Sequence, residues 1–179
     1  DPSYHANSLR RHPQPASMMA ARHVCIPLFP GFQLLDVAGP VAAFEAASQA
    51  GAEPSPQALD GGYRVSLVSP DGGPVTSSSG VSMGTVPAER AGAIDTLLVP
   101  GGEGTRAQDL DDRLIAFLRS RAPGCRRLAS VCTGTFLLAR GGLIPGCRVT
   151  THWRHAGALA RRHPDLEVLP DRIWVRDGR

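Results

Sequence analysis

The segment RRLASVCTGTFLLARGG, residues 126–142, contains a strand-like run that stops on a cysteine. Residues 128–131 are apolar enough for a buried strand, and Phe136 opens an apolar run with the density of a helix. Thr133-Gly134 supplies a turn between the two. The segment therefore predicts a strand, a sharp turn that holds Cys132 at the strand's carboxyl end, and a helix that begins directly afterwards.

A cysteine in this position has two interpretations. Unpaired amides and the helix dipole at a helix N-terminus lower the pKa of a thiol, which makes Cys132 a candidate nucleophile that titrates below the ordinary value of about 8.5. An inert packing cysteine is compatible with the same spacing. The spacing alone leaves both interpretations open.

Strand-like and helix-like runs alternate on both sides of this segment. A hairpin is expected around Ser79-Gly80, and Pro40 is well placed as the first residue of a helix. Because runs that alternate at these lengths pair their strands in parallel, we expect a doubly wound, flavodoxin-like α/β fold with a mostly parallel sheet and helices on both faces. The other strand-like runs are residues 24–29, 63–68, 94–99, 148–151, 166–169 and 173–176, and the other helical runs are 110–118 and 154–162.

Composition limits the classes of protein. The 179 residues are 42% hydrophobic and 20% charged, which is typical of one globular domain, and no run approaches the about 20 apolar residues of a membrane span. The net charge of +3 is carried by arginine alone, since the chain has no lysine. We interpret the arginine clusters as solvated helix faces rather than as a nucleic-acid surface.

Cysteine and histidine usage points to a cytoplasmic protein without a metal. The four cysteines form no CxxC pair and no disulfide framework, which fits a reducing compartment. His152, His155 and His163 lie near one another in the sequence but lack a partner at ligand spacing, so no metal site is predicted. The run Gly101 to Gly104 lacks the GxGxxG spacing, and no dinucleotide or other cofactor is expected.

The two ends of the chain carry separate expectations. Residues 1–21 are polar and aperiodic, without the apolar core of a signal peptide, and are expected to lie outside the domain formed by residues 22–179. Asp177-Gly178 is a strong hairpin turn after a strand-like run, yet only Arg179 follows. We therefore expect the closing strand and helix to be missing, and the exposed apolar surface to be covered in a homodimer.

Ligands bind at the carboxyl ends of strands in such sheets, and that edge gathers Asp36, Gly101, Gly102, Cys132 and His152. Asp36 lies three residues before Gly39, the expected helix N-cap, so capping does not account for it. A carboxyl group packed beside a thiol has a raised pKa and is able to pass a proton to a substrate. An ordinary loop aspartate bonded to nearby amides is the alternative.

Five motifs in order resemble the ThiJ/PfpI superfamily, the class I glutamine amidotransferase-like fold: LFPGFQLLDVAGP, SSSGVSM, DTLLVPGG, SVCTGTFLLARGGL and RVTTHW. Within it, the wording is most similar to the N-terminal domains of AraC-type transcriptional regulators and to isonitrile hydratases. The resemblance covers residues 22–179.

The resemblance implies roles for six residues. Cys132 matches the elbow nucleophile, Asp36 the acid that reaches the thiol, and Thr133 the residue beside it. Gly101 and Gly102 match a loop whose amides face a developing oxyanion. His152 matches a histidine near the pocket, where a structural role fits as well as a functional one.

Two functions follow from the resemblance. The first is a module of an AraC-type regulator that senses a small molecule and dimerises, without specific DNA binding by this chain, which has no helix-turn-helix candidate. The second is a cysteine-dependent hydratase in which Cys132 attacks an electrophilic carbon and Asp36 handles the proton. Peptidase and glutaminase activities are disfavoured because Thr133, not histidine, follows the cysteine. The ligand's identity is not encoded in any of these motifs.

Overall fold

A six-stranded sheet forms the centre of the protein in the computed structural model, which describes residues 21–50 and 62–178. The strand order is β3-β4-β2-β1-β5-β6, and every pair is parallel except β3 with β4. The doubly wound, mostly parallel sheet predicted from the sequence is confirmed. The strands are β1 (Arg22–Pro27), β2 (Tyr63–Ser69), β3 (Gly73–Thr76), β4 (Ser82–Pro87), β5 (Thr96–Val99) and β6 (Arg127–Ser130).

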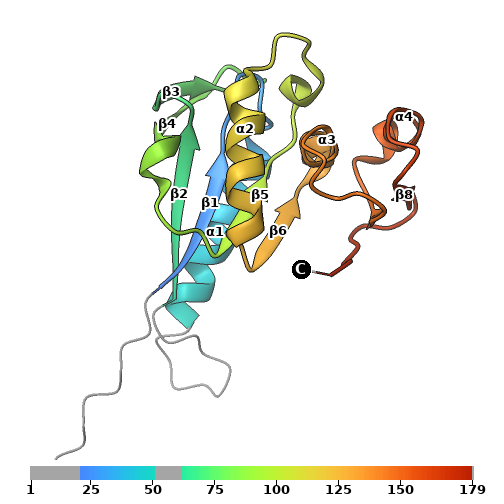
Figure 1. Ribbon diagram of the computed structural model, residues 1–179. Coiled ribbons are helices and arrows are strands. Elements are labelled where there is room, and N and C mark those ends of the chain that lie inside the picture. Colours follow the sequence, from blue (N-terminus) through green and yellow to red (C-terminus); the bar gives the residue numbers. More distant parts are fainter. Residues whose placement is uncertain (1–20, 51–61, 179) are drawn as a thin grey trace, which may run out of the picture.

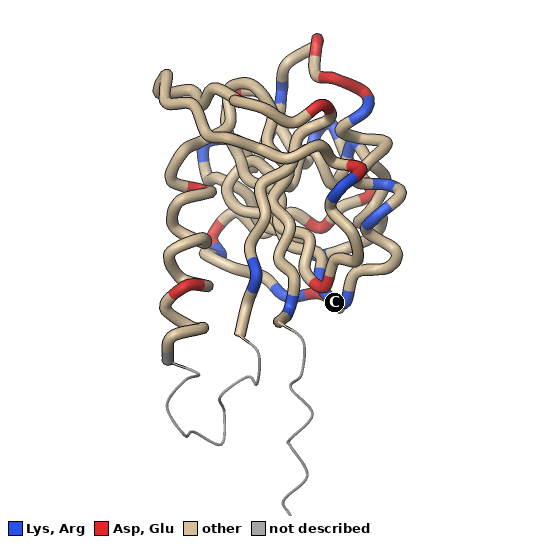
Figure 2. Tube along the Cα trace, turned by 90° about the vertical axis from the view of Figure 1, so that its left-hand side faces the viewer, with Lys and Arg blue, Asp and Glu red and all other residues tan. Residues whose placement is uncertain are grey.

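Helices cover both faces of this sheet, as the sequence predicted. In Figure 1, α1 lies behind the sheet and α2 in front of it, and the turned view in Figure 2 again shows α1 apart on one side. Within the described ranges, no helix combines the length and apolar character needed to cross a bilayer. The α-helices are α1 (Leu35–Ala50), α2 (Asp112–Arg121), α3 (Thr135–Arg140) and α4 (Ala156–Arg162). Short 3-10 helices are η1 (Ala88–Ala91), η2 (Glu103–Arg106), η3 (Ala122–Gly124), η4 (Cys132–Gly134) and η5 (Trp153–His155).

The strand order places a topological switch point between β1 and β5. The chain leaves β1 through α1 to reach β2 on one side, whereas β5 joins β1 on the other side. Because the connections diverge there, the loops at the carboxyl ends of β1, β5 and β6 leave a place for a ligand between them. The fold thus brings the loops that follow these three strands to one edge.

Burial falls from the centre of the sheet to its β6 edge. All four residues of β5 are buried, as are all residues of β1 after Arg22. Strands that are covered on both faces have this continuous apolar character. The residues of β6 are only half-buried or exposed, since β5 is its one neighbour in the described sheet.

The start of α1 differs from the sequence prediction, which made Pro40 the first residue of this helix. The helix begins at Leu35, and Pro40 lies inside it. Backbone bonds from Asp36 N to Gln33 O and from Val37 N to Leu34 O form the first turn before the proline. A proline this early removes one helical hydrogen bond without ending the helix. As a result, Asp36 lies in the first turn of α1.

The strand predicted at residues 173–176 is also wrong. This segment pairs with no other strand among the described residues, and Ile173 and Trp174 are 98% and 75% exposed. Its nearest supports are the Arg172 carbonyl, which accepts from the Thr150 hydroxyl at 2.8 Å, and the Asp177 carboxylate, which accepts from Arg148 N at 2.8 Å. Runs 148–151 and 166–169 form only β7 (Arg148–Val149) and β8 (Glu167–Val168), a separate parallel pair.

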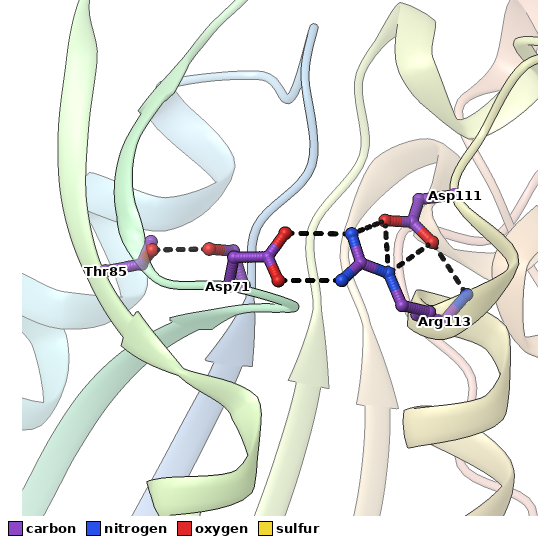
Figure 3. A network of polar contacts seen from close by, with 5 residues as sticks. Asp71, Thr85, Asp111 and Arg113 are labelled. Atoms are coloured by element: carbon purple, nitrogen blue, oxygen red, sulfur yellow. Dashed lines mark hydrogen bonds and ion pairs between the residues drawn. The ribbon is translucent and has the colours of Figure 1, made fainter.

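An arginine network joins α2 to the turn between β2 and β3 (Figure 3). The Arg113 guanidinium donates two hydrogen bonds to Asp71, at 2.7 and 2.8 Å, and others to Asp111, the N-cap of α2. Hydrogen bonds from Arg113 hold the pKa of the Asp71 carboxyl below its usual range. Since these side chains are exposed, the network orients α2 more than it stabilises the fold.

Candidate functional site

Cys132 has a backbone conformation that sets it apart. Its φ is +53°, and no other non-glycine residue in the described ranges has a positive φ. This left-handed conformation costs a β-carbon-bearing residue about 1–3 kcal/mol and persists only where the surroundings enforce it. The sharp turn predicted at Cys132 from the strand-turn-helix pattern is confirmed. It turns the chain from the end of β6 through η4 into α3.

Asp36 reaches the thiol from the first turn of α1. Its side chain is only 8% exposed, and Oδ2 accepts a hydrogen bond of 2.9 Å from Gly101 N. Burial raises the pKa of the Asp36 carboxyl, while hydrogen bonds from Gly101 and Cys132 and the charge of His152 act in the opposite direction. The raised pKa predicted from the sequence agrees with this environment.

The sequence prediction that the pKa of the Cys132 thiol lies below the ordinary value is wrong. Burial is the largest cause that raises the pKa of Cys132, and the charge of Asp36 raises it further. Hydrogen bonds from the Thr133 amide and hydroxyl lower the pKa but do not offset these causes. The thiol therefore keeps its proton, and Asp36 is placed to accept it when the sulfur reacts.

The amides of Gly101 and Gly102 are not free to face an oxyanion, contrary to the role implied by the resemblance. Gly101 N donates to Asp36, and Gly102 N donates to the Thr133 hydroxyl oxygen at 2.9 Å. The same hydroxyl donates back to Gly102 O at 3.1 Å. Both glycines therefore position neighbouring side chains, and an oxyanion would have to displace these bonds.

Gly101 is packed closely against both Asp36 and the turn that holds Cys132. A β-carbon at this position would lie 2.6 Å from Thr133 N, 2.7 Å from Asp36 Oδ2 and 2.9 Å from Cys132 Cβ. Real Cβ atoms do not approach heavy atoms so closely, and two of these neighbours are held by the turn itself. Only glycine lets the loop after β5 fit between Asp36 and Cys132.

Three threonines complete the support of the turn and were missed by the sequence analysis. The Thr151 hydroxyl donates to Cys132 O at 2.9 Å, and the Thr135 hydroxyl donates to Thr150 O at 2.9 Å. Together they tie the segment after β7 to η4 and α3. The motif RVTTHW contained the signal, but it was assigned to its histidine alone.

His152 has a structural role at the start of η5. Its Nδ1 accepts a hydrogen bond of 3.2 Å from Arg154 N and so caps η5. Its ring stacks on Trp153, with centroids 5.6 Å apart.

A cavity of about 1170 Å³ opens beside Cys132, between β6 and residues 170–178. His152 and Trp153 line the same cavity, so a small molecule inside it has access to the turn. Within the described part of the chain, no three His, Cys, Asp or Glu side chains cluster closely enough to hold a metal ion.

Comparison with known proteins places this geometry in a family. Residues 22–179 match the model of the DJ-1/PfpI family. The chain belongs to that family. Two solved structures show the same fold: a ThiJ/PfpI family protein from Pseudomonas syringae, with TM-score 0.69, 24% identity and coverage of 95% of this chain and 68% of that one, and an AraC family transcriptional regulator from Pseudomonas putida, with TM-score 0.63, 20% identity and coverage of 83% and 76%.

Curated relatives of this DJ-1/PfpI family chain include both classes expected from the motifs. The isonitrile hydratase of Pseudomonas putida is 36% identical over 84% of this chain and 60% of its own length. The transcriptional regulator GlxA of Rhizobium meliloti is 36% identical over 65% of this chain and 36% of its own length. A Streptomyces lividans protein from the cpoL 5' region is 42% identical over 82% of this chain and 99% of its own length.

We expect Gly101→Ala to disrupt the site and destabilise the protein by about 2 kcal/mol, because its new methyl group has no space. Urea unfolding measures the loss. Gly84→Ala is the matched control, since a β-carbon there meets nothing within 4 Å. Equal stability of the two variants would contradict the close approach of the loop to Asp36 and Cys132.

We expect the rate of Cys132 alkylation to rise with pH around a midpoint above the ordinary thiol value. Because the Asp36 charge raises the pKa of Cys132, Asp36→Asn lowers that midpoint. Mass spectrometry of the tryptic peptide 128–140 follows Cys132 separately from the other cysteines. Asp165→Asn, an exposed aspartate after α4, is the control and leaves the midpoint in place. An unchanged midpoint in Asp36→Asn would contradict the effect of the Asp36 charge on the pKa of Cys132.

Proposed function

We propose that this chain is the module of an AraC-type transcriptional regulator that senses a small molecule and dimerises, with the Cys132 turn as the sensing site. The observation that carries the proposal is the closed hydrogen bonding at the turn. The amides of Gly101 and Gly102 are occupied, and burial and the Asp36 charge keep the thiol protonated. Catalysis at a cysteine draws on free donors and a ready thiolate, whereas binding needs only positioned groups.

The turn is suited to sensing because separate segments meet on it. Asp36 brings in the start of α1, Gly101 the loop after β5, and Thr151 the segment after β7. A ligand that bonds to the sulfur or to Asp36 has to exchange one of these contacts. Its binding free energy is thereby coupled to the positions of the segments, which is the physical requirement of a switch.

A second candidate, a hydratase of the isonitrile type, is supported by the hydrogen bond between Cys132 and Asp36. Asp36 would take the thiol proton while the sulfur attacks the isonitrile carbon, and that carbon would then receive the proton, giving a thioimidate. Addition of one water and departure of the sulfur, which recovers its proton, would yield the formamide. The formamide contains the atoms of the isonitrile and of one water molecule.

An assay of isonitrile hydration separates the two functions. We expect wild type and Cys132→Ser to form no formamide beyond the uncatalysed rate from an alkyl isonitrile, because the amides that would stabilise developing charge are occupied. Titration calorimetry of a library of small polar molecules then finds a saturable ligand whose affinity drops at least about tenfold in Asp36→Asn. Formamide formation that requires Cys132 would contradict the sensor function and support the hydratase function.

We further propose that two copies associate through the β6 edge, in the cytoplasm, where thiols persist; Cys25, Cys132 and Cys147 form no disulfide. The amides of Arg127 and Val131 pair with the β5 side. Because successive amides of a strand point to opposite sides in the plane of the sheet, those of Leu128 and Ser130 point to the open edge. Exposed Ile173 and Trp174 lie across the cavity from this edge. An unpaired edge beside exposed apolar side chains favours association.

Sedimentation equilibrium is expected to show a dimer in wild type. Replacing both Ile173 and Trp174 by serine removes apolar surface from the interface and shifts the protein to monomer. Val81→Ser, 48% exposed on the far side of the sheet between β3 and β4, leaves the dimer intact. A wild-type monomer at micromolar concentration would contradict the interface.

A further inference from the structure

Two short helices flank the Cys132 turn, one on each side. η2 follows Gly102, whose amide bonds to Thr133 next to the cysteine. η5 follows Thr151, whose hydroxyl bonds to the Cys132 carbonyl. Both helices therefore begin within a few residues of a contact to the turn.

Each flanking helix carries an arginine without an acidic partner. Arg106 is the last residue of η2, and Arg154 lies in η5 with its guanidinium 5.3 Å from the centroid of the Trp153 ring. In the described residues, the arginines that form ion pairs with carboxylates are others: Arg113, Arg126, Arg140 and Arg148. We call Arg106 and Arg154 the border arginines.

The border arginines act on the same place. His155, whose ring centroid is 5.7 Å from that of His152, has its pKa lowered by burial first and then by the charges of Arg106, His152 and Arg154. One imidazole thus feels a guanidinium from each flanking helix. Since arginine stays protonated at any physiological pH, the two charges are permanent.

Acidic groups do not cancel this charge. Asp36 is buried behind the turn and bonded to Gly101, and Glu103 of η2 is exposed and forms no ion pair with either border arginine. In the charged lining of the adjoining cavity, Arg126 and Arg148 form ion pairs with Asp95 and Asp177, whereas Arg127, Arg172 and Arg176 form no ion pair among the described residues.

We propose that the border arginines Arg106 and Arg154 make the Cys132 site selective for small organic anions, with the anionic group held at the border and the rest of the molecule directed to the thiol. The proposal rests on the proposed function, for which it supplies the ligand's chemical class. A carboxylate a few bonds from an electrophilic or polar centre fits this arrangement.

Two maleimides test this selectivity, and one of them carries a carboxylate that the other lacks. At Cys132 we measure the rate constants for 3-maleimidopropionate and for N-ethylmaleimide and take the ratio of the first to the second. This ratio is then divided by the same ratio measured with 2-mercaptoethanol, an uncharged thiol. The same thiolate attacks both maleimides, so the ratio of the two rate constants does not depend on the thiol pKa. In low salt we expect a normalised ratio of about ten, reduced about threefold by Arg106→Gln or by Arg154→Gln and reduced again in about 0.5 M salt.

Arg64→Gln is the matched control, because Arg64 is exposed and pairs with His23 in the β1–β2 register at the opposite end of the sheet. It lowers the net charge by the same amount and is expected to leave the ratio unchanged. A wild-type ratio near one, an equal fall in Arg64→Gln, or no reaction of Cys132 with either reagent overturns the proposal. If the ratio is near one, the selectivity for anions is wrong, but a sensor for an uncharged ligand is still compatible with the result. If the protein turns over an isonitrile, the proposed sensor function is wrong, but the measured preference for the charged maleimide still holds.

Discussion

The hydrogen bond from Gly101 N to the Asp36 carboxylate is the contact on which the arrangement of the site depends. It links the end of β5 to the first turn of α1, two segments 65 residues apart in the chain. The contact forms because glycine lets the backbone approach both Asp36 and Cys132 to a distance that a side chain would forbid. Without it, the carboxyl group would lose the donor that compensates for its burial.

The same contact explains the chemistry of the thiol. Asp36 is held where its charge raises the pKa of Cys132, and the amide that holds it is thereby unable to stabilise an oxyanion. Capture of a ligand and fast turnover therefore place opposite demands on one amide. In this structure the amide serves the carboxyl group, which is the physical basis for favouring a sensor over a hydratase among the two classes of relative.

Strain at Cys132 and support around it are two parts of one arrangement. A left-handed backbone at a residue with a side chain is maintained by bonds from the surroundings, here from Thr151 to its carbonyl and from Thr135 to the neighbouring segment. Arg154 lies on η5, which follows the segment that these contacts anchor, and Arg106 lies on η2, which follows the bond from Gly102 N to Thr133. Positions of charge, thiol and carboxyl are thus set by the same few hydrogen bonds, so a ligand that changes one of them affects the others.

Periodicity in the sequence was sufficient for the parallel sheet and for the strand-turn-helix at Cys132, because both follow from local pattern and chain direction. It was also sufficient to gather Asp36, Gly101 and Cys132 at one sheet edge, since the carboxyl ends of parallel strands lie together. Only the tertiary structure decided what these groups do to one another. The raised thiol pKa, the occupied glycine amides and the unpaired segment at Ile173 depend on distances between segments remote in sequence, and such distances are set by packing rather than by local pattern.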